Sequence, residues 1–206
     1  KVTPGCSEFL GEEAGIAYRV RVFVPTDAYC ECWLIELRNT DGKTRRLRIH
    51  AQQTWTFHNH IIKYGNKRPC EKLSVASVAS GYMATAPEIG KPFDTLYGTF
   101  TAEGYTSGMV EKKVEKKLCT HKKDPAVYKD FPYTYVNLYA DVKLDAGESV
   151  KRTVVSAASE QAESTLATAG KYIDSKVAEA AWENTLAHWK DEFSHNTCTL
   201  PDKNLE

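Results

Sequence analysis

The spacing of the apolar residues changes once along this chain, near residue 158. Before that point several stretches alternate apolar and polar residues, which is typical of antiparallel strands with one buried face and one face in water. After it, apolar residues recur every three or four positions, as in amphipathic helices. The sequence therefore predicts a mainly β fold, an antiparallel β-sandwich over residues 1–157, followed by α-helices within residues 158–206.

Two stretches carry the alternation most clearly. The first places on one face Leu47, Ile49, Ala51, Trp55 and Phe57. The second places on one face Val136, Leu138, Ala140, Val142 and Leu144. Shorter strands are predicted over residues 18–24, 30–38 and 148–157, with tight turns at 39–42 and 145–147, where Asn, Asp and Gly gather. Residues 73–86 and 93–105 favour strands interrupted by glycine, whereas 58–71 and 120–132 favour loops.

One segment fits two interpretations. Val110, Val114 and Leu118 recur every four residues among Glu and Lys, which favours one or two helical turns. The same positions also fit alternate residues of a strand, so the pattern leaves both structures open.

Two helices are predicted after residue 158. The first would begin at Ser159, a favourable N-cap residue, and end at Gly170. Its shared face contains Ala162, Leu166 and Ala169. The second would begin at Asp174 or Ser175, and its apolar stripe contains Val177, Trp182, Leu186, Trp189 and Phe193. Such a stripe needs a large apolar partner, either this chain's own sheet or a further domain, and the sequence leaves both open.

Charge and cysteine usage exclude several classes of protein. There are 27 basic and 27 acidic residues, so no basic surface for nucleic acid is expected. No apolar run approaches the roughly 20 residues that span a bilayer, so no membrane insertion is expected. Cys30 and Cys32 would lie on the same side of a strand, which suits burial or metal binding better than a disulfide between them. Because there is no CxxC pair, the sequence predicts no metal site and reduced, mostly buried thiols in a cytoplasmic protein.

Several segments occur in the order found in one enzyme family. They are YRVRVFVP at 18–25, ECWLIELRN at 31–39 followed by TRRL at 44–47, LDAGE at 144–148, and WENTL at 182–186 with Trp189 and LPD at 200–202. Together they resemble the inverting glycoside phosphorylases of glycoside hydrolase family 94, the cellobiose and cellodextrin phosphorylase group. The chain departs from that family's pattern at Ala146, where proline is usual, and at Leu200, where threonine is usual.

The resemblance implies an antiparallel β-supersandwich of the galactose-mutarotase-like type, incomplete at its N-terminus, with C-terminal linker α-helices that lead to an (α/α)6 barrel. In that family the barrel holds the general acid and the phosphate-binding residues, so no catalytic residue is expected in residues 1–206. The parent enzyme would convert β-glucosidic di- or oligosaccharides to a sugar 1-phosphate, with inorganic phosphate as co-substrate and no other cofactor. We interpret Asp124, Asp130, Asp141 and Glu148 as solvated surface carboxylates.

The resemblance also implies a loop that contacts the acceptor sugar, commonly in the active site of the partner in a homodimer. By position this loop is residues 58–68, although the family's usual Gln-Arg pair is not recognisable there. The predicted substrate-binding residues are His60, Lys63, Tyr64, Asn66 and Arg68. The alternative function is a stand-alone carbohydrate-binding β-sandwich that binds glycan through this loop or through Tyr133, Tyr135 and Tyr139. These tyrosines are more simply expected to cover the linker helices.

Overall fold

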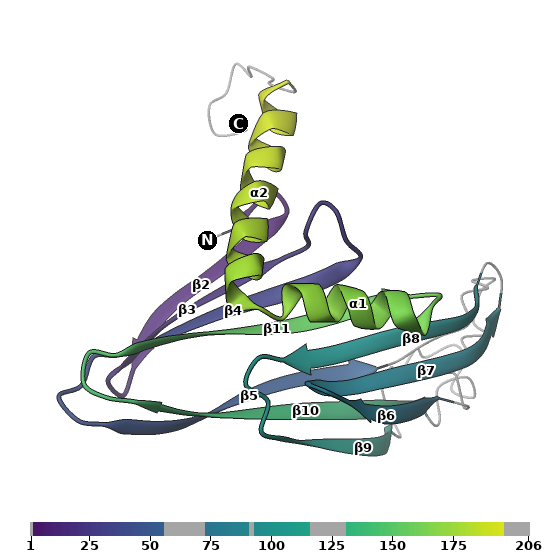
Figure 1. Ribbon diagram of the computed structural model, residues 1–206, viewed down its shortest axis with the longest axis horizontal. Helices are drawn as coiled ribbons and strands as arrows, with labels where there is room; N and C mark the ends of the chain where they lie inside the picture. The colour runs from purple at the N-terminus through teal and green to yellow at the C-terminus, as the bar shows by residue number, and fades with distance from the viewer. Residues whose placement is uncertain (1, 56–72, 91–92, 116–130, 196–206) are drawn as a thin grey trace, which may run out of the picture.

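The computed structural model describes residues 2–55, 73–90, 93–115 and 131–195. These residues form two antiparallel sheets that pack face to face, with two helices on the outer side of the larger sheet (Figure 1). The predicted fold class is therefore confirmed: the protein is mainly antiparallel β, with C-terminal α-helices.

Within the described ranges, the larger sheet has eight strands in the order β1-β2-β3-β4-β11-β8-β7-β6. Their bounds are β1 Val2–Thr3, β2 Cys6–Glu13, β3 Ile16–Phe23, β4 Cys30–Asn39, β6 Ser74–Val78, β7 Gly81–Gly90, β8 Phe93–Ala102 and β11 Ser149–Ser159. The smaller sheet, described over three strands, has the order β5-β10-β9. Its strands are β5 Arg45–Trp55, β9 Ser107–Glu115 and β10 Phe131–Leu144.

Short connections join the two sheets three times. The chain passes from β4 to β5, from β8 to β9 and from β10 to β11, and each connection carries it into the other sheet. The smaller sheet therefore packs against the face of the larger sheet to which β4, β11, β8 and β7 contribute core residues. Figure 1 shows the two sheets as separate layers. The core between the sheets includes Trp55, Phe100, Val136, Leu138 and Val154.

The clearest sequence patterns are confirmed. In β5, Ala51 and Trp55 are buried while the alternate residues Arg48 and His50 are exposed. In β10, every residue of the predicted apolar face from Val136 to Leu144 is buried. Phe57 lies outside the described residues.

The helical interpretation of residues 110–118 is wrong over the described part. Residues 107–115 form β9, which pairs along its whole length with β10, so that Val110 lies opposite Val136. A four-residue spacing is also a multiple of two, and here the neighbouring strand supplies the hydrogen bonds that a helix would have made internally.

The helices are α1 Ala162–Tyr172 and α2 Ser175–Ser194. The predicted cap at Ser159 is wrong, because Gln161 occupies the N-cap position and the Ser159 hydroxyl instead contacts the Thr165 hydroxyl at 2.6 Å. The predicted end at Gly170 is also wrong. Gly170 lacks the positive φ that a helix-ending glycine adopts, and the helix continues until Tyr172 is buried.

The buried face of α1 also differs from the prediction. It contains Thr165, Ala169 and Tyr172, whereas Leu166 is 37% exposed. The predicted start of α2 is confirmed, because the Asp174 side chain accepts a hydrogen bond from the Lys176 N–H at 2.8 Å. Neither helix in the described part of the chain is long and apolar enough to cross a membrane.

Candidate functional site at the helix–sheet junction

The first half of α2 is packed on the larger sheet through one indole. Trp182 is 5% exposed, and its ring lies edge-to-face against Phe23 of β3, with centroids 5.4 Å apart. Buried Ala178 and Thr185 lie one turn to either side of it. The apolar surface beneath α1 and α2 includes Cys6, Cys30, Cys32, Leu34, Val155 and Ala157. Burying an aromatic side chain this fully stabilises the helix on the sheet by about 2–3 kcal/mol.

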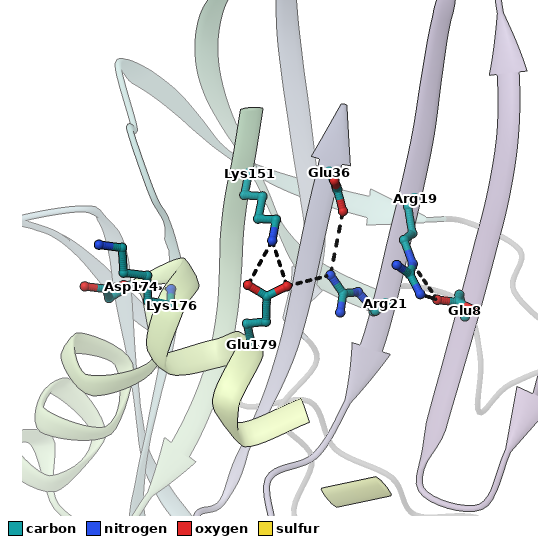
Figure 2. A network of polar contacts seen from close by, with 8 residues as sticks. All are labelled: Glu8, Arg19, Arg21, Glu36, Lys151, Asp174, Lys176 and Glu179. Carbon is teal, nitrogen blue, oxygen red and sulfur yellow. Dashed lines mark hydrogen bonds and ion pairs between the residues drawn. The ribbon is translucent and has the colours of Figure 1, made fainter. Parts of the chain in front are cut away.

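A buried arginine lies at the edge of this apolar surface. Arg21 is 3% exposed, and its guanidinium lies 5.6 Å from the centre of the Trp182 ring. It contacts the carboxylates of Glu179 on α2 at 3.4 Å and Glu36 on β4 at 3.8 Å (Figure 2). A buried guanidinium is costly unless carboxylates neutralise it, so this position on the sheet selects an acidic residue on α2.

Glu179 also binds the neighbouring strand. Lys151 of β11 donates to both Glu179 carboxylate oxygens, at 2.7 and 2.8 Å (Figure 2). The hydrogen bonds from Lys151, with a smaller contribution from Arg21, lower the pKa of Glu179 below its ordinary value. Glu179 is therefore ionised at neutral pH and links α2 to β3 and β11 together. We call Arg21, Glu36, Lys151 and Glu179 the helix clamp.

The end of α1 is fixed to the β3–β4 loop by a second polar cluster. The Tyr172 hydroxyl donates to Asp27, and Lys171 donates to the other Asp27 oxygen at 2.9 Å. Burial and the Asp27 hydrogen bond raise the pKa of Tyr172, whereas the hydrogen bonds from Tyr172 and Lys171 lower the pKa of Asp27. A cleft of about 440 Å³ opens beside this cluster, with Val177 and Ala181 of α2 along one wall. The cluster ties the C-terminal end of α1 to the β3–β4 loop.

The second half of α2 extends beyond the strands of the larger sheet (Figure 1). Trp189 covers Gly5, where an added Cβ would lie 2.1 Å from the indole Nε1. Phe193 packs on Trp189 with ring centroids 5.9 Å apart but is 50% exposed. Packing of the helix on this chain's own sheet is therefore confirmed for Trp182, while the C-terminal end of the stripe keeps an exposed apolar surface.

Two carboxylates near the smaller sheet, Asp141 and Asp145, have partners that lower their pKa. Arg48 donates to both oxygens of Asp141, at 2.6 and 3.0 Å, and this pairing lowers the pKa of Asp141. Hydrogen bonds from Thr44 and Lys143 lower the pKa of Asp145. A general acid at neutral pH needs the opposite shift. The interpretation of Asp141 as an exposed surface group is confirmed, as is that of Glu148, which accepts from the Asp145 N–H at 2.8 Å. Asp124 and Asp130 lie outside the described residues.

The predicted sugar-binding residues stay a prediction. All of them lie within residues 56–72, outside the described residues: His60, Lys63, Tyr64, Asn66 and Arg68.

The expectation that the tyrosines of β10 cover the linker helices is wrong for the two whose side chains are described. Tyr135 and Tyr139 lie on the outer face of the smaller sheet, whereas the helices pack on the larger sheet. Tyr139 contacts the His50 ring, with centroids 4.9 Å apart, and the Arg48 guanidinium. The reason is that the alternate face of β10, with Val136 and Leu138, faces the core.

The cysteine prediction is confirmed for the described thiols. Cys6, Cys30 and Cys32 are buried and free of disulfides, with the Cys30 and Cys32 Sγ atoms 3.9 Å apart. Among the residues that the structure describes, no group of three or more His, Cys, Asp or Glu side chains is arranged to hold a metal ion. The other three cysteines, Cys70, Cys119 and Cys198, lie outside these ranges.

Comparison with protein families gives a match for the N-terminal strands of the larger sheet. Residues 1–78, which run from β1 to β6, match the family model described as "Glycosyl hydrolase 94, supersandwich domain". This part of the chain is a glycosyl hydrolase 94 supersandwich domain. The resemblance drawn from the sequence motifs is thereby confirmed over residues 1–78, and Arg21 and Glu36 of the helix clamp belong to this matched part.

The other comparisons add less. A search of curated proteins found no match to the sequence. Among the solved structures that match is "Putative kojibiose phosphorylase from human microbiome", with 10% sequence identity and a TM-score of 0.46. The match covers 92% of this chain and 23% of that chain, so this chain spans about a quarter of that protein's length.

The sequence did not reveal the helix clamp, although it held one signal. Arg21 shares a strand face with Phe23, and both side chains are buried, so a charged residue lies beside an apolar one in the core. A charge in such a position indicates a partner of opposite charge, but the sequence does not say which carboxylate, because Glu179 is 158 positions away.

Proposed function

We propose that this chain is the non-catalytic sandwich and linker portion of an inverting glycoside phosphorylase. The parent enzyme would cleave β-glucosidic di- or oligosaccharides with inorganic phosphate and release a sugar 1-phosphate, with no other cofactor. The observation that carries the proposal is the match of residues 1–78 to the glycosyl hydrolase 94 supersandwich domain. We assign residues 1–157 to the sandwich and residues 158–206 to the linker to an (α/α)6 barrel.

The helix clamp supports a role for this chain in orienting the barrel. Its ion pairs and the buried Trp182 fix the first half of α2 on the supersandwich domain. The second half then projects in a defined direction and presents Phe193, which is half exposed, to the barrel. A helix anchored at one end and apolar at the other transmits the orientation of the sandwich to the next domain.

The chemistry of phosphorolysis is assigned to the barrel. The reaction needs a carboxylic acid to protonate the leaving oxygen while phosphate attacks the opposite face of the sugar. Asp27, Asp141, Asp145 and Glu179 are unsuited to that role because partners lower the pKa of each. In this proposal the chain contributes the loop at residues 58–68 to the acceptor subsite and makes contacts in a homodimer. It works in the cytoplasm, where free thiols are stable.

The acceptor loop gives the sharpest test in the longer polypeptide that the proposal requires. Arg68→Ala should raise the KM for the acceptor sugar in the synthetic direction at least about tenfold, because a forked hydrogen-bond donor is lost. Lys67→Ala, beside it in the sequence, is the matched control and should leave this KM nearly unchanged. Equal effects of the two variants would remove the loop from the proposal, and absence of any phosphate-dependent turnover of glucosides would refute the proposal as a whole.

A second candidate is a stand-alone carbohydrate-binding sandwich. It is favoured by the outer face of the smaller sheet, where the Tyr139 hydroxyl accepts from the Asn137 amide at 3.1 Å beside the His50 ring. Aromatic rings next to amide groups are suited to sugar hydroxyls and C–H faces. Calorimetry of the 206-residue chain with cello-oligosaccharides separates the two candidates: saturable heat lost in Tyr139→Ala supports the second, and no heat supports the first.

A further inference from the structure

The two thiols at the start of β4 form a contacting pair beneath the helices. The Cys30 and Cys32 Sγ atoms are 3.9 Å apart, within hydrogen-bonding distance for sulfur. Cys30 is 5% and Cys32 0% exposed, and both belong to the apolar cluster that also contains Tyr172 and Trp182. A disulfide is about 2.05 Å long, so the two sulfur atoms would have to approach each other by about 1.9 Å to form one.

The backbone allows this approach at one end of the pair. In a straight strand, residues two apart have Cα atoms about 6.6 Å apart, near the upper limit that a disulfide spans. Cys32 is held on both sides, because it pairs with Phe23 of β3 and with Val155 of β11. In the described sheet Cys30 pairs with Ala157 of β11 but with no residue of β3, which ends at Phe23. Cys30, the first residue of β4, is therefore the one that can move.

The pair shares a proton unequally, which makes Cys30 the better nucleophile. The hydrogen bond from Cys32 lowers the pKa of Cys30, although burial acts in the opposite direction. The same hydrogen bond, together with burial, raises the pKa of Cys32. The proton therefore stays on Cys32, whose thiol donates to the sulfur of Cys30. Because the thiolate is the form of cysteine that oxidants attack, Cys30 would react first and Cys32 second.

A small oxidant has a route to Cys30 from the cleft beside the end of α1. Asp27 and Lys171 line this cleft of about 440 Å³. The charges of both side chains act on Cys30, so the thiol lies close behind the cleft wall. The cleft has room for a peroxide, whereas Cys32 lies deeper in the core and is reached only through Cys30.

We infer that Cys30 and Cys32 are a site of reversible oxidation to an intramolecular disulfide, with a peroxide as the oxidant. The Cys30 thiolate attacks one peroxide oxygen, the O–O bond breaks, and Cys30 becomes a sulfenic acid while hydroxide leaves and takes a proton from solvent. The Cys32 sulfur then attacks the Cys30 sulfur, the S–O bond breaks, and the Cys32 proton leaves with that oxygen as water. The two thiols lose two electrons, and the peroxide is reduced to two waters. Two small thiols reverse the step by exchange and leave as their own disulfide.

Oxidation should loosen the end of α1. Cys30 lies three residues after Asp27, whose carboxylate accepts hydrogen bonds from the Tyr172 hydroxyl and from Lys171. Movement of Cys30 toward Cys32 displaces the β3–β4 loop and with it the acceptor of both hydrogen bonds. The disulfide and the intact Asp27 cluster therefore compete. The inference is independent of the proposed function, because it concerns only the sulfur chemistry and the helix attachment of this chain.

The first test treats the reduced 206-residue chain with hydrogen peroxide and follows the tryptic peptide of residues 22–38, which contains both thiols. This peptide should lose two hydrogens and regain them with dithiothreitol. Cys6 is the internal control, because it is equally exposed, at 5%, in the same apolar cluster, and burial raises the pKa of its thiol. The pair should be oxidised at least about tenfold faster than Cys6. Equal rates, or a disulfide formed only between chains, would overturn the inference.

Two variants assign the order of the steps. In Cys32→Ser, a sulfenic acid should persist at Cys30 and be trapped by dimedone, whereas Cys30→Ser should leave Cys32 unmodified under the same conditions. Circular dichroism checks that both variants fold, and the measurement on wild type stands without them. Sulfenic acid at Cys32 in Cys30→Ser, formed as fast as at Cys30 in Cys32→Ser, would contradict the assigned order.

Hydrogen exchange tests the consequence for α1. The Ile173 amide donates to the Ala169 carbonyl at 3.0 Å, and in the oxidised chain it should exchange at least about tenfold faster than in the reduced chain. Tyr172→Phe already lacks the hydroxyl bond to Asp27, so oxidation should change its exchange less. Unchanged exchange at the end of α1 in the oxidised wild type would refute the link between the thiol pair and the helix.

Discussion

Replacement of Glu179 by glutamine tests the helix clamp in isolation. The change keeps the size of the side chain and removes its charge, so that Arg21, whose side chain is 4% exposed, keeps only Glu36 at 3.8 Å. The Lys151 pair is about two-fifths exposed, with side-chain accessibilities of 38% and 37%, and belongs to the class that contributes less than about 1 kcal/mol. The Arg21 contact is more protected and leaves a buried charge poorly neutralised when broken.

Together these terms predict that Glu179→Gln lowers the free energy of unfolding by about 1–2 kcal/mol at neutral pH. For a chain of this size the melting temperature should fall by about 2–8 °C. Urea titration measures the free energy, and Glu183→Gln is the matched control: an exposed glutamate on the same helix, expected to change stability by less than about 0.5 kcal/mol. Equal free energies of unfolding for the two variants would refute a stabilising role of the helix clamp.

The pH dependence separates a charge effect from a packing effect. The folded-state pKa of Glu179 is lowered, so its contribution is fully present above the unfolded-state value of about 4.3 and is lost as pH falls through the folded-state pKa. The stability difference between wild type and Glu179→Gln should therefore be constant near neutrality and shrink below about pH 4. A difference that persists unchanged in acid would contradict the electrostatic account.

Three further substitutions test the junction. Trp182→Ala should destabilise the protein by about 3–5 kcal/mol in urea, because it empties the space against Phe23; a loss below about 1 kcal/mol would mean that the helix is not anchored there. Tyr172→Phe removes the hydroxyl that donates to Asp27 and should cost about 1–2 kcal/mol, and stability equal to wild type would show that the bond is dispensable. Gly5→Ala should destabilise because φ is +72° and the new Cβ meets Trp189. In a Trp189→Ala background that cost should shrink, and strictly additive effects would place Trp189 elsewhere.

The strands with one solvent-exposed face and one buried face could be predicted from the sequence. β5 and β10 were predicted because apolar and polar residues alternate along them, and the apolar residues, such as Ala51 and Leu138, are the buried ones. The same holds for Asp174, whose capping bond involves a residue only two positions away. Such local relations are visible without the fold.

Other elements are fixed by contacts between distant residues. β2 was not predicted, because Phe9 and Leu10 are consecutive apolar residues on opposite faces of a strand near the sheet edge, where neither face is continuously buried. The sequence of β9 left a helix and a strand both open, because its pairing with β10 is not a property of its own sequence. α1 continues past Gly170 because burial of Tyr172 beside Asp27 outweighs the low helix propensity of glycine.

In the candidate site, too, local relations could be predicted and contacts between distant residues could not. The pairing of Cys30 and Cys32 on one side of β4 was predictable from a spacing of two. The helix clamp was not, because Arg21, Lys151 and Glu179 come from three elements that only the folded sheet brings together. The acceptor loop stays a prediction drawn from the family resemblance.

The central claim is that this chain orients a catalytic domain and performs no chemistry itself. The most direct measurement incubates the purified 206-residue chain with inorganic phosphate and a panel of β-glucosidic disaccharides, and follows the release of sugar 1-phosphate. The account predicts no release above the enzyme-free control. Saturable, phosphate-dependent release by the chain alone would contradict it.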